Sequence, residues 1–167
     1  MTEPLIESFF IHDIDHGTGG RIAIARLPGR SGHLEEDVEA IAGWEPALVL
    51  SLTEREEATI YGAGALGALL EPRGIRHLWF PIRDFGAPEA DDAHWRMLAA
   101  ELHGSLDRGE AILLHCLGGK GRSGMIAMRL MVERGLSPDD ALRRVRLARP
   151  GAVETGEQEA WAARTAG

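Results

Sequence analysis

The chain has one cysteine, no long hydrophobic segment and no excess of basic residues. Because Cys116 is the only cysteine among 167 residues, an internal disulfide and a zinc site built from several thiolates are both excluded. No apolar run approaches the ~18 residues that a membrane-spanning helix needs. Lysine and arginine number 18 against 26 acidic residues, and the net charge of −8 leaves no overall positive field for nucleic acid or an anionic membrane. We therefore expect any bound anion to be held by a local site.

The length and composition indicate one globular domain with a substantial hydrophobic core. The 167 residues are 44% hydrophobic and 26% charged, which is typical of a folded rather than a disordered chain. The N-terminus lacks the basic and apolar segments of a secretory signal, and a lone thiol suits a reducing compartment. We expect a cytoplasmic protein that neither inserts into a membrane nor binds nucleic acid.

Apolar segments of strand length alternate with amphipathic segments of helical period, which is typical of an α/β domain. Strands are expected at 20–27, 46–52, 75–80 and 111–114. Helices are expected at 35–42, 54–70, 91–107 and from 123 to about 135, the second of them interrupted by glycines. No repeat or linker divides the chain, so we expect a single compact unit.

The segment between the last strand and the helix after it has the features of an anion-binding loop. Cys116 stands at the strand end, Arg122 stands near the helix start, and three of the five residues between them are glycines. Glycines allow successive amides to point at one oxyanion, and Arg122 adds a planar fork of donors. The same positive potential favours the thiolate form of Cys116, ready to attack a bound phosphoryl group. The residues expected to bind that group are Leu117, Gly118, Gly119, Lys120 and Gly121.

Two other interpretations of this loop are less favoured. A buried, inert cysteine is a common fate of a single Cys, but it leaves the glycines and Arg122 without a role. A Walker A loop requires a glycine and a Ser or Thr at positions that Leu114 and Gly121 occupy. A phosphate-binding loop with a cysteine nucleophile is therefore favoured.

Expelling an alkoxide or a phenoxide from phosphorus requires a proton donor, ideally on a loop that can close over the substrate. Residues 82–90 have no periodicity and contain a glycine and a proline, so we expect a surface loop. Asp84 lies in that loop and is the candidate acid. Asp91 and Asp92 are the alternatives, but they stand where acidic residues favour the start of a helix.

The segment from His115 to Gly124 resembles the Cys-x5-Arg-Ser signature of the protein tyrosine phosphatase superfamily. It is most similar to dual-specificity phosphatases of the cyclin-dependent kinase-associated type, and residues 80–88 look like the acid loop of that family. The resemblance implies a mixed, mostly parallel sheet of four to five strands flanked by helices. It also implies a two-step reaction through a phosphocysteine.

The resemblance extends from about Ala23 to Gln158. We accordingly expect an N-terminal extension at 1–20 and the phosphatase catalytic domain at 21–167. Gln158 matches the family position that orients the hydrolytic water, although an exposed glutamine is more often simply solvated.

Two neighbours of the signature loop each have two interpretations. His115 is either a satisfied core histidine or a residue that supports the thiolate through hydrogen bonds. Ser123 either caps the following helix or donates to the Cys116 thiolate as it leaves, and the two roles are compatible.

Taken together, the residues predict hydrolysis of phosphomonoesters, first of phosphotyrosine and also of phosphoserine or phosphothreonine in proteins. Cys116 is the expected nucleophile, Arg122 the transition-state ligand and Asp84 the acid and then the base, with no cofactor or metal. An inositol-phosphate or phosphoinositide phosphatase is an alternative, because Lys120 adds a second cation to the loop. A non-catalytic phosphoprotein-binding pseudophosphatase is another, but its usual marks, a replaced cysteine, arginine or acid, are absent. A sulfurtransferase has no use for the Asp84 loop.

Overall fold

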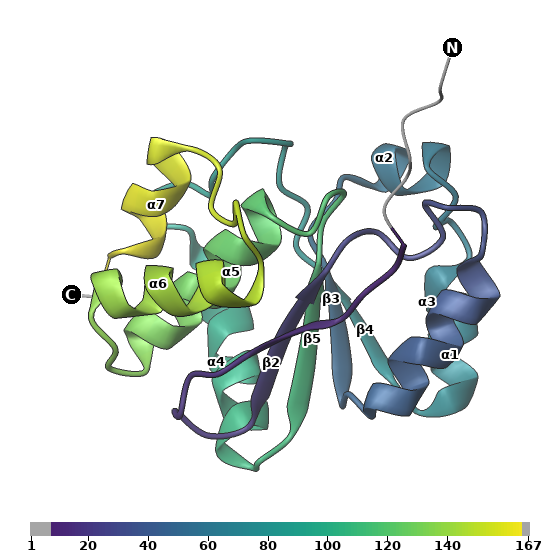
Figure 1. Ribbon diagram of the computed structural model, residues 1–167, viewed down its shortest axis with the longest axis horizontal. Coiled ribbons are helices and arrows are strands. Elements are labelled where there is room, and N and C mark those ends of the chain that lie inside the picture. Colours follow the sequence, from purple (N-terminus) through teal and green to yellow (C-terminus); the bar gives the residue numbers. More distant parts are fainter. Residues whose placement is uncertain (1–7, 165–167) are drawn as a thin grey trace.

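A computed structural model describes residues 8–164 and has a five-stranded sheet at its centre (Figure 1). The strand order is β1-β2-β5-β3-β4, with β1 antiparallel to β2 and the other neighbours parallel. The strands are β1 (His12–Ile14), β2 (Arg21–Ala25), β3 (Leu48–Ser51), β4 (Arg76–Trp79) and β5 (Ala111–His115). The expected α/β fold with a mostly parallel sheet is confirmed.

The edge strand β1 lies within the segment that we expected to be an N-terminal extension. Its His12 pairs with Ile24 of β2, and Ile14 is buried in the core. Residues 12–14 are therefore part of the sheet rather than separate from the domain. Three residues are too few for a hydrophobic alternation to be recognised, which is why the sequence did not indicate this strand. Residues 1–7 of the expected extension lie outside the described part of the chain.

Helices cover both faces of the sheet (Figure 1). On one side lie α1 (Leu34–Trp44), α2 (Arg55–Ile60), α3 (Leu66–Leu70) and the 3₁₀ helix η1 (Glu71–Arg73). On the other side lie α4 (Ala93–Asp107), α5 (Gly121–Glu133), α6 (Pro138–Ala148) and α7 (Gly156–Ala162). The interruption expected within 54–70 is confirmed, because Gly62 adopts a φ of 94° between α2 and α3. None of the helices in the described residues is long and apolar enough to cross a bilayer.

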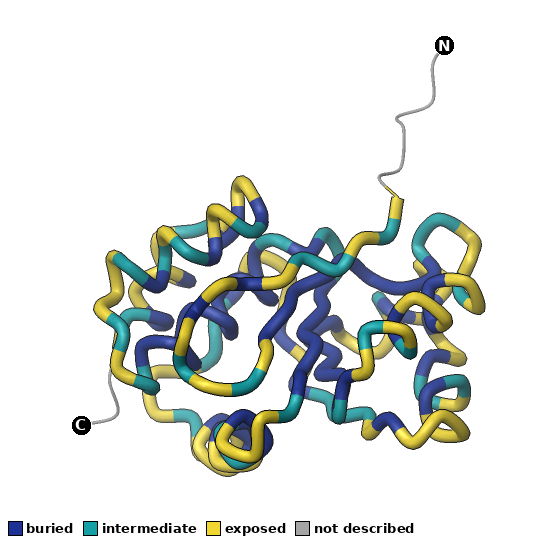
Figure 2. The backbone as a smooth tube through the Cα atoms, turned by 60° about the horizontal axis from the view of Figure 1, so that its bottom comes forward, coloured by how far each residue is buried: buried dark blue, intermediate teal, exposed yellow. Residues whose placement is uncertain are grey.

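Side chains of the central strands alternate between two apolar layers. Leu48 and Leu50 of β3 pack in the core that includes residues of α4 and α5, whereas Val49 packs in the core that includes residues of α1 and α3. Figure 2 shows the buried stretches gathered in the central strands and the exposed stretches on the outer turns of the helices. Consecutive residues at the ends of these strands therefore point to opposite faces.

The carboxyl ends of β5, β3 and β4 meet at one edge of the sheet. Because these three strands are parallel neighbours, the segments that follow them lie together. The segment after β5 contains Cys116, the one after β3 leads into α2, and the one after β4 contains Asp84. The topology thus brings distant parts of the sequence to one place.

Candidate active site

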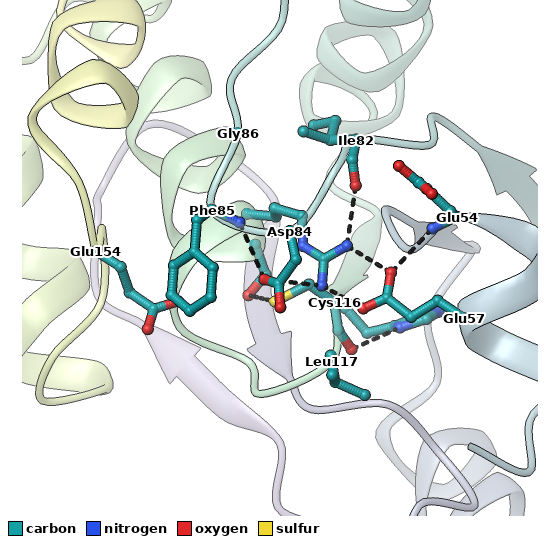
Figure 3. Close-up of polar contacts among 12 residues, drawn as sticks. Glu54, Glu57, Ile82, Asp84, Phe85, Gly86, Cys116, Leu117 and Glu154 are labelled. Carbon is teal, nitrogen blue, oxygen red and sulfur yellow. Dashed lines mark hydrogen bonds and ion pairs between the residues drawn. The ribbon is translucent and has the colours of Figure 1, made fainter. Parts of the chain in front are cut away.

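Cys116 lies directly after β5, with only 2% of its surface exposed. Its Sγ is 3.3 Å from the Oγ of Ser123, a residue of the first turn of α5 (Figure 3). Helix α5 begins at Gly121, and Lys120 occupies the N-cap position, so the capping role that we considered for Ser123 is wrong. The helix starts earlier than expected because the glycine loop passes straight into it. The hydroxyl is instead placed to donate to the sulfur.

The carbonyls of the loop after Cys116 are bound from outside the loop. Leu117 O accepts from Arg30 Nη1 at 3.2 Å and from Leu27 N at 3.1 Å, and Gly118 O accepts from Arg149 Nη2 at 3.1 Å. In a trans peptide the next N–H points opposite to the carbonyl. With these carbonyls turned outward, the following amides point toward the centre of the loop, as an anion-binding nest requires.

Gly119 and Gly121 are required by close packing of the loop. Gly119 has a φ of 72°, and a Cβ there would lie 2.6 Å from the backbone nitrogen of Arg26. A Cβ on Gly121 would meet the carboxylate of Glu154 and the amide group of Gln158. The glycines predicted from the sequence therefore allow β2 on one side and the 151–158 segment on the other to support the loop.

Arg122 is 1% exposed and is held by two elements. Both carboxylate oxygens of Glu57 accept from its Nη1 and Nη2 at 2.7 Å, and Ile82 O accepts from Nη1 at 2.9 Å (Figure 3). Burial alone would lower the pKa of Arg122, but the hydrogen bonds that it donates to Glu57 and the nearby negative charges raise the pKa above its ordinary value. Its Nε is buried and has no hydrogen-bond partner among the described residues, which leaves a donor for an anion.

Glu57, which binds Arg122, is the residue of the candidate site that the sequence did not indicate. It is the third residue of α2, where its side chain also accepts from the backbone N–H of Glu54 in a capping box. Burial would raise the pKa of Glu57, but the hydrogen bonds and charge of Arg122 outweigh burial and lower it. The sequence contains no motif that marks Glu57. Its position next to Arg122 can be inferred only from the strand order, because β3 pairs with β5 and α2 follows β3.

Asp84 faces the same guanidinium from the opposite side (Figure 3). Its Oδ1 is 3.2 Å from Arg122 Nη2 and also accepts from the backbone N–H of Phe85 at 3.0 Å. The Asp84 side chain is 44% exposed, so it can reach both the site and solvent. The other candidate acids are occupied elsewhere: Asp92 caps α4 by accepting from Trp95 N, and exposed Asp91 pairs with Arg96.

The loop that carries Asp84 is attached to α7. Gln158 is fully buried, and its Nε2 donates to Gly86 O at 3.1 Å, while Trp161 Nε1 donates to Glu89 O at 3.3 Å. The Oε1 of Gln158 accepts from the backbone N–H groups of Glu154 and Thr155. The amide group that we expected to orient water is therefore bonded to the protein at both ends.

His115 is fully buried, and burial lowers its pKa to about 4. Its Nδ1 is 3.2 Å from Cys116 O and its Nε2 is 2.5 Å from Ser51 Oγ. His115 is therefore a satisfied core histidine. Its ring contacts the carbonyl of Cys116 rather than the sulfur, so a role in supporting the thiolate stays a prediction. The stem of Lys120 packs near Gly151, whose added Cβ would lie 3.7 Å from its Cδ.

The arrangement combines a nucleophilic sulfur, a buried guanidinium and a partly exposed carboxylate around one glycine-rich loop. Such a set can bind a tetrahedral oxyanion, attack its central atom and protonate a leaving oxygen. No group of His, Cys, Asp and Glu residues suited to hold a metal ion occurs within 8–164.

The chain is similar to several known proteins. A family model described as the Swiss Army Knife protein DSP-PTPase phosphatase domain matches residues 26–162. The putative tyrosine phosphatase 067L of Invertebrate iridescent virus 3 is 39% identical over 49% of this chain and 37% of its own length. Mouse cyclin-dependent kinase inhibitor 3 is 30% identical over 75% of this chain and 60% of its own length. The chain thus matches about a third to three fifths of the length of these relatives.

Solved structures share the fold. The structure of kinase associated phosphatase with its catalytic-site cysteine changed to serine superimposes with a TM-score of 0.83 and 24% identity, covering 93% of both chains. Tk-PTP in its active form superimposes with a TM-score of 0.70 and 34% identity, covering 90% of this chain and 92% of Tk-PTP.

Proposed function

Because the chain belongs to the DSP-PTPase phosphatase family, within the dual-specificity branch of the protein tyrosine phosphatase superfamily, we propose that it hydrolyses phosphomonoesters through a phosphocysteine. The proposed substrates are phosphotyrosine and phosphoserine or phosphothreonine in proteins. The observation that carries the proposal is that Asp84 meets the loop of Cys116 and Arg122, although these two segments lie far apart in the sequence.

In the first step Cys116 Sγ attacks phosphorus, and the bond from phosphorus to the ester oxygen breaks. The inward-pointing loop amides and the Nε and Nη2 of Arg122 bind the equatorial phosphoryl oxygens as charge develops on them. Asp84 gives its proton to the departing oxygen, so that an alcohol or phenol leaves rather than an anion. Glu57 keeps the guanidinium plane fixed by its two hydrogen bonds of 2.7 Å.

In the second step a water molecule attacks the phosphocysteine, and the Asp84 carboxylate takes its proton. The bond from phosphorus to sulfur breaks, and the sulfur leaves as a thiolate. Ser123 Oγ, 3.3 Å from that sulfur, donates a hydrogen bond to the departing thiolate. The net reaction consumes one water and releases inorganic phosphate. Because a free thiol is needed at Cys116, we also propose a reducing location such as the cytoplasm.

A phosphatase assay over a panel of phosphopeptides, inositol phosphates and an activated aryl phosphate, with EDTA present, tests this function. We expect turnover of phosphotyrosine peptides that EDTA leaves unchanged. Cys116→Ser should remove turnover while inorganic phosphate still binds, because Arg122 and the loop amides remain. Equal turnover with and without the cysteine, or turnover abolished by EDTA, contradicts the proposal. A preference for inositol phosphates that Lys120→Ala removes favours the alternative substrate class.

A further inference from the structure

A line of three polar side chains crosses the sheet from the nucleophile to the edge strand. His115, Ser51 and His77 lie on β5, β3 and β4, which are neighbours in the sheet. Ser51 Oγ is 2.5 Å from His115 Nε2 and 2.6 Å from His77 Nε2. Ser51 and His115 lie two residues after Val49 and Leu113, which face the layer of α1 and α3, so the line lies on that face.

The hydrogen bonds of this line have only one consistent direction. The carbonyl of Cys116 can only accept, so the Nδ1 of His115 carries the hydrogen of the 3.2 Å contact. Because burial lowers the pKa of His115 to about 4, the ring has one proton at neutral pH and its Nε2 accepts. Ser51 must then donate to His115. The single hydroxyl hydrogen is thereby used, and the oxygen of Ser51 accepts from the Nε2–H of His77.

His77 sits at the half-buried end of the line, on the edge strand β4. A Cβ added at Gly67 of α3 would lie 2.8 Å from its Nδ1, and the ring of Trp79 lies 5.1 Å from its own ring. Burial, and then the charge of Arg55, lower the pKa of His77 below its ordinary value. The charged groups beside it are Arg55 of α2, Glu71 of η1 and Arg76 of β4. A neutral His77 with its proton on Nε2 and a protonated His77 both supply the donor that Ser51 needs.

We propose that His77 is a positioning residue for the nucleophile, acting through Ser51 and His115, an inference that rests on the function proposed above. Its Nε2–H orders the Ser51 hydroxyl, which selects the tautomer of His115 that donates to the carbonyl of Cys116. That carbonyl belongs to the first peptide group of the phosphate-binding loop. The donated hydrogen bond therefore fixes the orientation of this peptide group, directly after the nucleophile. If the hydrogen bonds ran in the opposite direction, His115 would carry its proton on Nε2, and the lone pair of its Nδ1 would face the carbonyl oxygen and repel it.

The wild-type protein provides the first test, because the tautomer of each ring can be measured by 15N chemical shifts. At neutral pH we expect His115 protonated on Nδ1 only and His77 carrying a proton on Nε2. His115 protonated on Nε2, or a neutral His77 protonated on Nδ1, overturns the proposal. This measurement uses no substrate, so it fails or succeeds independently of the proposed phosphatase function.

Variants provide the second test, with the alkylation of Cys116 by iodoacetamide as the readout. Because Cys116 is the only cysteine, the rate against pH reports its thiolate alone. Ser51→Ala and His77→Leu should slow alkylation about two- to sixfold at the wild-type midpoint pH, because losing one hydrogen bond shifts that midpoint upward by up to about one pH unit. His77→Gln should restore most of the rate, because its amide nitrogen replaces the Nε2 donor.

A control separates loss of the line from loss of stability. Val38 is fully buried in the same layer, and its aliphatic side chain forms no hydrogen bond, so Val38→Ala should lower the melting temperature and leave the alkylation profile in place. The proposal is overturned if His77→Leu alkylates like the wild type, or if His77→Gln and His77→Leu behave alike. Altered alkylation in a protein that turns over no phosphomonoester would instead support the line and contradict the proposed function.

Discussion

Two side chains at the site must hold opposite protonation states for the proposed reaction, because Cys116 attacks as a thiolate and Asp84 donates a proton. The two carboxylates at Arg122 are held differently. Its carboxylate lies at the guanidinium of Arg122 and is partly exposed, whereas Glu57 is locked onto the same guanidinium by two hydrogen bonds. The Asp84 carboxylate therefore has access to solvent and to a bound substrate, whereas Glu57 fixes the cation.

Asp84→Asn should remove the proton donor and leave the phosphate site in place. We expect the rate to fall about 10²- to 10³-fold for tyrosyl and alkyl phosphates, and much less for an activated aryl phosphate whose phenoxide leaves unassisted. The rate of the wild type should be bell-shaped in pH with its maximum below neutrality, and the basic limb should flatten in the variant. Steady-state rates over a series of leaving groups and pH values measure both effects.

Asp92→Asn is the matched control, because Asp92 caps α4 and lies outside the site. It should leave the leaving-group dependence unchanged. If Asp84→Asn instead loses rate equally for all leaving groups and retains the basic limb, Asp84 is not the acid, and Asp91 and Asp92 become the candidates to test.

At the scale of single residues, the sequence indicates those that act within one continuous motif. Cys116 and Arg122 are separated by a short glycine loop, so their relation is local and their chemistry can be inferred from spacing. Glu57 lies on another helix and reaches Arg122 only because β3 pairs with β5. Such a contact depends on strand order, which spacing along the chain does not give.

At the scale of elements, the structure ties the acid loop to α7 by two hydrogen bonds. Gln158 donates to Gly86 O and Trp161 donates to Glu89 O, one at the middle and one near the end of the loop. Arg122 donates to Ile82 O at its beginning. The loop that carries Asp84 is therefore held at three carbonyls, and the donors to two of them come from the short helix α7.

Gln158→Glu keeps an acceptor for the amides of Glu154 and Thr155 but turns a second oxygen toward Gly86 O. The two oxygens repel, so the loop should lose its middle attachment. We expect the first phosphoryl transfer to slow about tenfold for tyrosyl phosphates and less for activated aryl phosphates, the pattern of a mispositioned acid. Rapid-mixing measurement of the phenol released in the first turnover follows this step.

Trp161→Phe is the companion variant, because it removes the donor to Glu89 O and keeps an aromatic ring next to Trp95 and Arg129. It should give a smaller effect with the same dependence on the leaving group. A Gln158→Glu protein with a normal first turnover and a slow second step would contradict the attachment role and restore the water-orienting role expected from the resemblance.

Elements differ in how well the sequence indicates them. The central strands and the long helix α4 were expected within a few residues, because their hydrophobic patterns extend over several turns or a whole strand. Strand β1 and helix α7 were not expected. β1 has three residues and α7 has seven, which are too few for a hydrophobic pattern to be recognised. Both elements depend for their stability on packing against the rest of the domain.

At the scale of the whole molecule, the buried His115 links stability to pH. Its pKa of about 4 in the folded state is below the ordinary value of 6.5, so the unfolded chain binds more protons between these pH values. The free energy of unfolding should therefore fall as pH drops from about 6.5 to about 4, by roughly 3 kcal/mol from this residue. Urea denaturation of the wild type and His115→Asn across this range measures the effect.

Asparagine retains an N–H for Cys116 O but does not titrate, so the stability difference between the two proteins should shrink as the pH is lowered. Parallel stability curves from pH 7 to 4 would mean that the folded protein protonates His115 as readily as the unfolded chain does. In that case the direction assigned to the His115 hydrogen bonds would also be wrong.

The central claim is that the phosphoryl group passes through Cys116, and trapping the intermediate tests it most directly. The substrate is a phosphotyrosine peptide, and Ser123→Ala is used to slow the departure of the thiolate. After acid quenching during turnover, we predict that the peptide containing Cys116 carries the mass of one phosphoryl group, and that this mass is absent with Cys116→Ser. Turnover with an unmodified Cys116 peptide, or with the phosphoryl group on another residue, contradicts the account.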